Sequence, residues 1–452
     1  MSDVSLLSDW IKRVASRETH VAVLGLGYVG LPLALLFSEA GFRVTGFDID
    51  AEKVATLHAG RSYIHHIEAA HIAAARAAGF SATTNFTELS ACDAILICVP
   101  TPLAPDHTPD MSFITGTVEA LAPHTRAGQL IVLESTTWPG TTTELVVPAL
   151  ERFGPAGTVV QREAGADGPD TIGGLLVAFS PEREDPGNRT TPRRAIPKVI
   201  GGVSADASSA ASTLYGTIFE RTVLVSSPEA AEMTKLLENI YRGVNIALVN
   251  ELKQLCIAMG IDIWEVIDAA ATKPFGFQAF YPGPGIGGHC IPVDPFYLSW
   301  RARQFNQPTR FIELAGQVNE AMPAFVVGSV ERALERRGLA LSGAKILLLG
   351  IAYKPDVDDL RESPALVLFD LLQRGGAEVS YNDPFFAEVG TGRHYSLQAR
   401  STPLNRVGEF DCVLLVTDHS AYDIPALVAA SKLFIDTRNA TRGLTAANLI
   451  RC

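Results

Sequence analysis

Residues 20–50, HVAVLGLGYVGLPLALLFSEAGFRVTGFDID, decide the fold of this chain. Residues 20–24 form a short apolar run, which is typical of a buried parallel strand. Residues 31–40 have the composition of a helix, and residues 42–47 predict a second strand that Asp48 closes. A strand, a glycine turn, a helix and a second strand in this order indicate a doubly wound parallel α/β sheet.

The glycine turn carries the first sign of a ligand. Gly25, Gly27 and Gly30 form the pattern G-x-G-x-x-G between the first strand and the helix, where backbone N–H groups can hold a pyrophosphate. Asp48 ends the next strand, where an acid binds ribose hydroxyls and repels a 2′-phosphate. The alternative is a tight turn without a ligand. Strand, helix and acid together favour NAD over NADP as the cofactor.

The same alternation returns near the end of the chain. Residues 343–359, GAKILLLGIAYKPDVDD, read as a strand and a loop, and residues 411–419 and 432–439 predict further strands. We therefore expect two Rossmann-like parallel-sheet domains joined by a helical central domain with one long helix. The predicted boundaries are 1–226 for the NAD-binding domain, 227–336 for the central domain and 337–452 for the last domain.

Composition excludes several classes of protein. The chain has 452 residues, 47% hydrophobic and 19% charged, with a net charge of −12, so it is a well-buried globular protein without a broad basic face for nucleic acid or anionic membranes. No apolar run approaches a membrane span, and the start has no signal-peptide core. The six cysteines show no paired or metal-site spacing, so we expect a reduced, cytoplasmic protein without a bound metal.

One cysteine stands apart from the others. Cys290 lies in residues 282–295, PGPGIGGHCIPVDP, where Gly287 and Gly288 lead into a His-Cys pair, four residues before Asp294. A Cys–His pair with His289 is an alternative, but adjacent side chains rarely face each other. The other cysteines that flank apolar runs are expected to be buried thiols.

The long central helix is predicted from Ser227 to Gly260 by its caps. Lys235, Asn239 and Arg242 share one of its faces, which is either a functional face or a solvated stripe. Its other faces are largely apolar and suit burial between domains or subunits. Polar residues also follow two predicted strands, at the sheet edge where such folds bind ligands. These residues are Ser135, Thr136 and Glu182.

The pieces GLGYVGLPLA, VPTP, STTWPG, SPERE, EMTKLLENIYRGVNIALVNE, GGHCIPVDP and AYKPDVDDLRESP together resemble the UDP-glucose/GDP-mannose dehydrogenase family over nearly the whole chain. SPEREDPGN and KPFGFQAFYPGPGIGGHCIPVDPFYL are most similar to the branch that acts on UDP-N-acetylglucosamine. The resemblance implies a four-electron oxidation of a sugar CH₂OH to a carboxylate with NAD. A cysteine would trap the aldehyde as a thiohemiacetal and then carry a thioester.

Site residues follow from the same resemblance and motifs. The expected catalytic residues are Cys290 as nucleophile, Lys235 and Asn239 as oxyanion donors, Asp294 and Thr136 around a water, and Glu182 for thioester hydrolysis. The expected cofactor-binding residues are Gly25, Gly27, Tyr28, Val29, Gly30, Asp48, Lys53, Pro100, Thr101 and Ser135. The expected substrate-binding residues are Arg242, Tyr281, Gly287, Gly288, Lys354 and Arg361, the last two at the UDP pyrophosphate.

Two positions depart from UDP-glucose enzymes. Val293 stands where those enzymes have a lysine, and Lys273 is the only cation near the place of their cross-subunit arginine. Both differences are in keeping with an N-acetyl sugar branch without proving it. The resemblance implies a UDP-N-acetylglucosamine 6-dehydrogenase that supplies surface polysaccharides and dimerises through the central helix. The alternatives are the same chemistry on UDP-N-acetylgalactosamine, UDP-N-acetylmannosamine or UDP-glucose, a two-electron hydroxyacid dehydrogenase that leaves Cys290 unexplained, and a non-catalytic sensor of NAD and nucleotide sugars.

Overall fold

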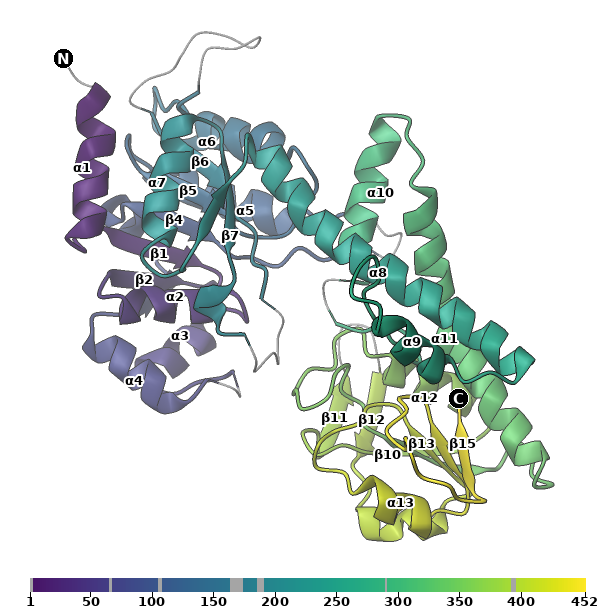
Figure 1. Cartoon of the computed structure of the whole chain (residues 1–452). Helices are drawn as coiled ribbons and strands as arrows, with labels where there is room; N and C mark the ends of the chain where they lie inside the picture. Colours follow the sequence, from purple (N-terminus) through teal and green to yellow (C-terminus); the bar gives the residue numbers. More distant parts are fainter. Residues whose placement is uncertain are drawn as a thin grey trace. The chain divides into compact units, whose positions relative to one another are not determined.

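The computed structural model describes residues 3–64, 67–104, 108–162, 174–184, 191–288, 291–391 and 396–452, so His289 and Cys290 lie outside the described residues. The chain forms two compact units. The first holds residues 1–238 and 300–306, and the second holds residues 239–299 and 307–452 (Figure 1). The three-domain division expected from the sequence stays a prediction.

The first unit is built on an eight-stranded sheet of order β3-β2-β1-β4-β5-β6-β7-β8. Its strands are β1 (His20–Leu24), β2 (Arg43–Phe47), β3 (Ser81–Thr83), β4 (Ala94–Ile97), β5 (Leu130–Leu133), β6 (Leu176–Phe179), β7 (Lys198–Gly202) and β8 (Thr222–Leu224). Neighbouring strands are parallel except β6 and β7. In the described part of the β6–β7 connection there is no crossover helix, which parallel neighbours need. The doubly wound sheet predicted from the sequence is confirmed, with this one antiparallel pair.

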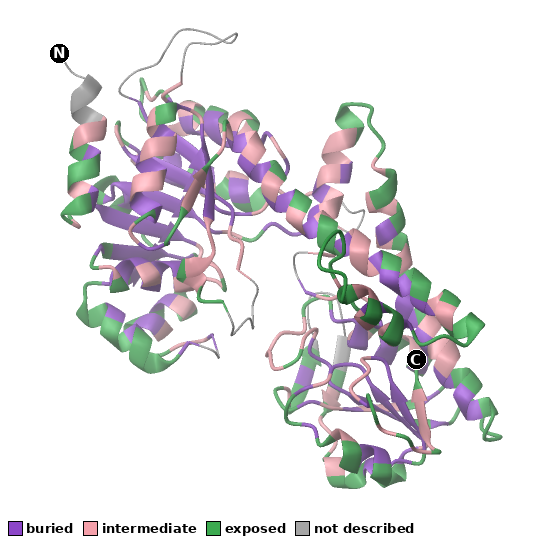
Figure 2. Cartoon of the chain, viewed as in Figure 1, coloured by how far each residue is buried: buried purple, intermediate pink, exposed green. Residues whose placement is uncertain are grey.

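Helices cover both faces of this sheet, and its central strands are buried between them, whereas the edge strand β8 is partly exposed (Figure 2). One core includes Trp10, Leu33 and Leu214, and the other includes Val118 and Leu150. The helices are α1 (Asp3–Ala15), α2 (Gly30–Glu39), α3 (Ala51–His58), α4 (Ala69–Ala77), α5 (Ser112–Leu121), α6 (Val147–Phe153) and α7 (Ala205–Tyr215). Shorter helical turns are η1 (Phe86–Ala91), η2 (Ala122–His124), η3 (Thr142–Val146) and η4 (Arg193–Ala195).

The long helix predicted from its caps is α8 (Pro228–Met259), with 32 residues. It ends at Gly260, whose φ of 72° lies in the left-handed region that favours glycine. The division between the two units falls within α8, after Glu238. Four helices follow in the second unit or at its border: α9 (Ile263–Ala271), α10 (Asp294–Gln304), α11 (Arg310–Glu335) and α12 (Pro364–Arg374).

The second unit contains the second predicted sheet, which is parallel, with the order β10-β9-β13-β14-β15. Its strands are β9 (Lys345–Leu349), β10 (Glu378–Asn382), β13 (Cys412–Leu415), β14 (Phe434–Asp436) and β15 (Leu449–Arg451), accompanied by the hairpin β11 (Glu388–Thr391) and β12 (Ser396–Arg400), the turn η5 (Leu404–Glu409) and helix α13 (Ile424–Ala430). Cys92, Cys98 and Cys412 are buried free thiols, as predicted. Across the described segments, no helix is both long and apolar enough to span a membrane.

Candidate active site

The three glycines after β1 have different structural roles. Gly25 has a φ of 88°, and a side chain there would lie 2.7 Å from the carbonyl oxygen of Cys98. A side chain at Gly30 would lie 1.9 Å from the carbonyl oxygen of Gly25, so this glycine lets α2 pack against the turn. A side chain at Gly27 would meet nothing within 4 Å. Gly27 therefore leaves open space at the helix N-terminus, where a dinucleotide pyrophosphate fits.

Asp48 at the end of β2 stabilises this turn. It is 7% exposed, and its Oδ2 accepts a hydrogen bond from the backbone N–H of Leu26 at 2.9 Å, while Oδ1 accepts one from the N–H of Asp50 at 3.0 Å. Lys53 Nζ lies 3.6 Å from Oδ2. The predicted adenosine site thus has its acid beside the open glycine turn, and its residues fit a bound NAD.

The other expected cofactor residues lie at the ends of neighbouring elements. Tyr28 is 40% exposed within the glycine turn, and Val29 precedes α2. Pro100 is exposed after β4, whereas Thr101 is buried. Ser135 is also buried, and its hydroxyl donates to the carbonyl oxygen of Val99 at 2.7 Å. Ser135 therefore joins the ends of β4 and β5, a structural role that the sequence did not indicate.

Sequence reasoning missed Glu232, which joins α8 to the segment after β5. This carboxylate is fully buried and accepts hydrogen bonds from Gly140 N at 2.6 Å, Thr142 N at 2.9 Å and Thr142 Oγ1 at 2.7 Å. Burial raises the pKa of Glu232 to about 7. Glu232 therefore fixes the segment after β5, which begins with half-buried Thr136, to helix α8. The attachment lies one turn before Lys235.

Glu182, after β6, belongs to a buried charge network in the first unit. Its Oε1 accepts hydrogen bonds from Arg183 N at 2.9 Å and Glu184 N at 2.8 Å. Its Oε2 lies 3.7 Å from both Lys198 Nζ and Arg193 Nη2. Burial alone would raise the pKa of Glu182, but Lys198 and Arg193 hold that pKa at about 2. Glu182 is therefore an ionised carboxylate at neutral pH.

The three polar residues predicted to share a face of α8 differ in burial. Lys235 is 6% exposed and Asn239 is 4% exposed, whereas Arg242 is exposed. The interpretation as a solvated stripe therefore fails for Lys235 and Asn239. Their expected role as donors to an oxyanion stays a prediction.

Asn239 contacts the expected base within the second unit. Asn239 Nδ2 donates to Asp294 Oδ2 at 2.5 Å, and Asp294 is 2% exposed at the first residue of α10. The structure therefore brings together two of the residues that the sequence assigned to catalysis. Asp294 lies four residues after Cys290, whose own placement is outside the described residues.

The glycines before Cys290 pack closely against the last domain. A side chain at Gly287 would lie 2.7 Å from Tyr353 Cβ and 2.8 Å from the carbonyl oxygen of Glu362, and one at Gly288 would lie 2.9 Å from the Tyr353 ring. Gly288 N also donates to the carbonyl oxygen of Arg361 at 3.1 Å. These contacts leave no room for a side chain at Gly287 or Gly288.

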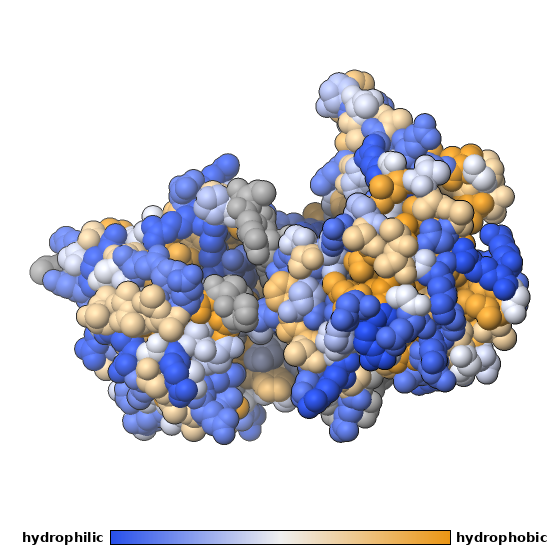
Figure 3. All heavy atoms as spheres, turned by 90° about the horizontal axis from the view of Figure 1, so that it is seen from below, coloured by the Kyte–Doolittle hydropathy of each residue, from blue (hydrophilic) through white to orange (hydrophobic). Residues whose placement is uncertain are grey.

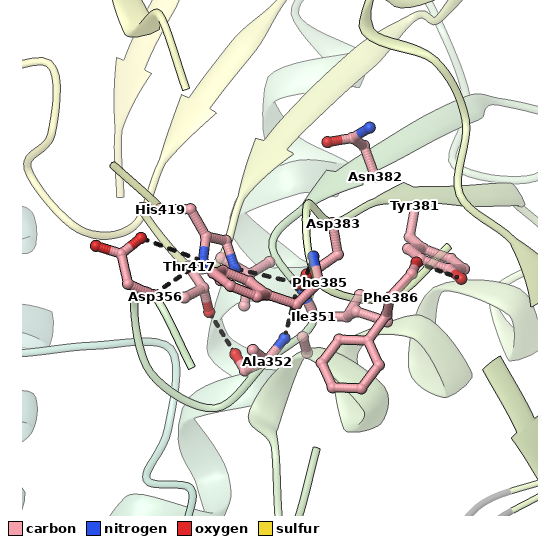
Figure 4. A network of polar contacts seen from close by, with 12 residues as sticks. Ile351, Ala352, Asp356, Tyr381, Asn382, Asp383, Phe385, Phe386, Thr417 and His419 are labelled. Atoms are coloured by element: carbon pink, nitrogen blue, oxygen red, sulfur yellow. Dashed lines mark hydrogen bonds and ion pairs between the residues drawn. The ribbon is translucent and has the colours of Figure 1, made fainter. Parts of the chain in front are cut away.

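A buried aspartate anchors the loop that carries the expected pyrophosphate ligands (Figure 4). Asp383 Oδ2 accepts from Ile351 N at 2.7 Å, Ala352 N at 3.0 Å and His419 Nε2 at 3.1 Å. His419 Nδ1 in turn accepts from Asp356 N at 3.0 Å, so the Nε2–H tautomer is present. Asp383 at the end of β10 thus holds the turn after β9 as Asp48 holds the turn after β1.

The expected substrate residues on this loop and nearby are placed as follows. Lys354 is half-buried, and Arg361 is exposed, with its Nη2 at 2.6 Å from Asp359 Oδ2. Tyr281 packs against α9, where its ring stacks on Trp264 with centroids 5.2 Å apart and its hydroxyl donates to Asp268 at 2.8 Å. Arg361 and Tyr281 thus each have a partner within the second unit, Asp359 and Asp268 respectively.

Comparisons with known proteins agree with this arrangement. Three models of the UDP-glucose/GDP-mannose dehydrogenase family match the chain: the NAD binding domain at residues 19–219, the central domain at 229–321 and the UDP binding domain at 347–443. The UDP-N-acetyl-D-glucosamine 6-dehydrogenase of Pseudomonas aeruginosa is 33% identical over 407 residues, 90% of this chain and 92% of that protein. The UDP-N-acetyl-D-mannosamine dehydrogenase of Pyrococcus horikoshii is 34% identical over 405 residues, 89% and 90% of the two chains.

Solved structures show the same fold. The structure of the Pyrococcus horikoshii UDP-D-ManNAc dehydrogenase matches with a TM-score of 0.82 and 31% identity, over 96% of this chain and 99% of that one. A UDP-glucose dehydrogenase from Pyrobaculum islandicum matches with a TM-score of 0.81 and 28% identity, over 95% and 96% of the two chains. The chain therefore belongs to the UDP-glucose/GDP-mannose dehydrogenase family and is an NAD-dependent nucleotide-sugar dehydrogenase.

Proposed function

We propose that this protein oxidises the C6 alcohol of UDP-N-acetylglucosamine to the carboxylate through a covalent intermediate on Cys290, for surface polysaccharide precursors. The observation that carries the proposal is the buried Asn239–Asp294 hydrogen bond of 2.5 Å, which joins a candidate oxyanion donor to a candidate base. Bound NAD⁺ supplies the hydride acceptor for each of the two oxidations. The remaining steps belong to side chains of the chain itself.

The first oxidation needs a base and a site for the developing charge. Asp294 takes the proton of the C6 hydroxyl, directly or through a water that Thr136 helps to hold. Lys235 and Asn239 stabilise the negative charge on the C6 oxygen, and such donors act strongly when they are buried. Asn239 also orients Asp294 through its amide N–H.

The second oxidation proceeds on the cysteine. The Cys290 thiolate adds to the aldehyde, and the resulting oxyanion takes up a proton to give a thiohemiacetal. Loss of the hydroxyl proton to Asp294 and of a hydride, for which NAD⁺ would be the acceptor, gives a thioester. Water then attacks the thioester carbonyl, the carbon–sulfur bond breaks, and the sulfur keeps the electron pair as a thiolate. Glu182 assists this hydrolysis. Lys354 and Arg361 bind the UDP pyrophosphate, because an acidic protein must neutralise that charge locally.

UDP-N-acetylmannosamine is the second candidate substrate, because relatives with that activity are 34–39% identical to this chain. The two sugars differ in configuration at C2. A panel of UDP-N-acetylglucosamine, UDP-N-acetylmannosamine, UDP-N-acetylgalactosamine and UDP-glucose, with NADH counted per sugar, separates them. The proposal requires the highest kcat/KM with UDP-N-acetylglucosamine and two NADH per sugar. Absence of NADH with every sugar would instead favour the non-catalytic sensor.

The active form is proposed to be a homodimer through α8. Within the second unit this helix exposes an apolar stripe at helical spacing: Tyr241, Leu248, Leu252, Leu255 and Met259 are 49%, 52%, 36%, 53% and 61% exposed. On the face of the molecule drawn in Figure 3, hydrophobic side chains lie at the surface among hydrophilic ones. A second copy of α8 would cover such a stripe. Leu255→Glu should convert the dimer to a monomer in light scattering, and an unchanged dimer mass would contradict this interface.

A further inference from the structure

Behind Glu182, the first unit buries three polar side chains that the proposed mechanism does not use. Glu134 and Lys198 are each 2% exposed, and Tyr215 is fully buried. Lys198 Nζ lies 2.5 Å from Glu134 Oε2, donates to the carbonyl oxygen of Pro181 at 3.1 Å and lies 3.7 Å from Glu182 Oε2. A buried ammonium is costly unless it is paired, so its position between two carboxylates needs a reason.

The position of this ammonium is fixed by several groups. Glu134 ends the β5 region and binds Lys198 through one oxygen, while its other oxygen accepts the hydroxyl of Tyr215. Lys198 Nζ also lies 5.2 Å from the ring centroid of Tyr215 and 5.5 Å from that of Phe219. Cation–π contacts of this length add to the ion pair. Lys198 therefore has little freedom to move relative to Glu182.

The two oxygens of Glu182 are used differently. Oε1 is held by the backbone N–H groups of Arg183 and Glu184. Among the described residues, Oε2 has no hydrogen-bond partner, although it is buried and lies 3.7 Å from Lys198 and from Arg193. One oxygen thus fixes the carboxylate, and the other keeps its capacity to accept a proton.

We propose that Lys198, held by Glu134, is a positioning residue that keeps Glu182 ionised and directs its Oε2 to accept the proton of the hydrolytic water. This inference rests on the proposed function. In the step, the water oxygen bonds to the thioester carbon, its proton passes to Glu182, and the carbon–sulfur bond breaks with the electron pair going to Cys290. The products are a carboxylic acid and a thiolate, and no oxidant is consumed.

Among the charged groups around Glu182, Lys198 is the one that best accounts for its ionisation. Lys198 has the largest lowering effect on the pKa of Glu182, and Arg193 the next largest. Arg193 has a closer partner, because its Nη2 lies 2.5 Å from Glu184 Oε2. The titratable groups that surround the carboxylate are Glu134, Arg183, Glu184, Arg193, Tyr215, Lys235 and Cys98.

The test compares Lys198→Met with Lys198→Arg in the full chain. Stopped-flow NADH release and intact-protein mass spectrometry, from pH 5 to 9, separate the two oxidations from hydrolysis. At pH 5, Lys198→Met should release an NADH burst of about two per active site and then accumulate the thioester adduct. Loss of Lys198 raises the pKa of Glu182, so Glu182 is protonated at pH 5 in this variant. The ratio of the hydrolysis rate at pH 5 to that at pH 8 should therefore be about tenfold lower in the variant than in the wild type.

Lys198→Arg keeps the positive charge and should restore the wild-type pH dependence of the hydrolysis rate. Lys12→Met, at an exposed lysine of α1, should behave like wild type. If Lys198→Met fails to fold because Glu134 is left buried without a partner, the double variant Lys198→Met/Glu134→Gln removes both charges and gives the same readout. Wild-type hydrolysis rates and pH profile in the folded methionine variant would overturn the role of Lys198. Active wild type with no adduct in Glu182→Gln would instead refute the covalent mechanism and this inference with it.

Discussion

Replacing Glu232 by glutamine should remove a pH dependence of stability that this buried carboxylate creates. Burial raises the pKa of Glu232 from 4.5 to about 7, so between these pH values the folded state binds a proton that the unfolded state releases. The stabilisation is complete below pH 4.5 and is lost as the pH rises through 7. Each pKa unit is worth about 1.4 kcal/mol, so the loss is about 3 kcal/mol.

The assay is urea denaturation at pH 5, 6, 7 and 8, followed by tryptophan fluorescence, to which the buried Trp138 of the same segment contributes. Between pH 5 and 8 the wild-type free energy of unfolding should fall by about 2.5 kcal/mol more than that of Glu232→Gln, because part of the loss occurs below pH 5. Glu251→Gln, at an exposed position on α8, controls for loss of a charge on the same helix. Equal pH slopes for wild type and Glu232→Gln would refute the assignment of a raised pKa to this carboxylate.

Three further substitutions test the binding sites. Asp48→Ala should reduce the ratio of kcat/KM for NAD to that for NADP, because it removes the carboxylate that binds the ribose hydroxyls and repels a 2′-phosphate. A wild type that prefers NADP would contradict this assignment. Arg361→Ala should raise KM for the nucleotide sugar roughly tenfold, since a charge-assisted contact contributes about 1.5–3 kcal/mol. Arg374→Ala, at an exposed position of α12, should leave KM unchanged, and unchanged UDP affinity of Arg361→Ala in calorimetry would move the site elsewhere. Asp383→Ala leaves the buried Ile351 and Ala352 N–H groups without an acceptor and should lower the melting temperature and UDP affinity together; full UDP affinity in the folded variant contradicts the anchoring role.

Local pattern predicted the elements with strong signals. The strand of residues 20–24 and the glycine turn follow directly from an apolar run and three spaced glycines, and α8 ends at the predicted glycine cap. Asp48 was found because an acid after a strand has a known place in such sheets. These features depend on neighbours in sequence, and a single chain displays them.

Long-range contacts were not predictable in this way. Glu232 is 92 residues from Gly140, and Lys198 is 64 residues from Glu134, so no spacing pattern links the partners. The sequence does show that Lys198 is a charged residue directly before the apolar run VIGG, which could indicate a buried ion pair. It does not reveal which residue is the partner. Burial was not predictable from spacing either. Helical spacing places Arg242 on the same face as Lys235 and Asn239, but it does not show that Arg242 is exposed while the other two are buried.

The role of the Cys290 thiol is the central claim, and mass spectrometry of intact variants incubated with NAD⁺ and the nucleotide sugar tests it most directly. Glu182→Gln should accumulate a thioester on Cys290, because the oxidations proceed and only water attack is slowed. Cys290→Ser should retain an ester adduct and stop near two NADH per active site, since an alkoxide is a poorer leaving group than a thiolate. Cys290→Ala should form no adduct. Repeated turnover of Cys290→Ala to the carboxylate at the wild-type rate would contradict the covalent mechanism.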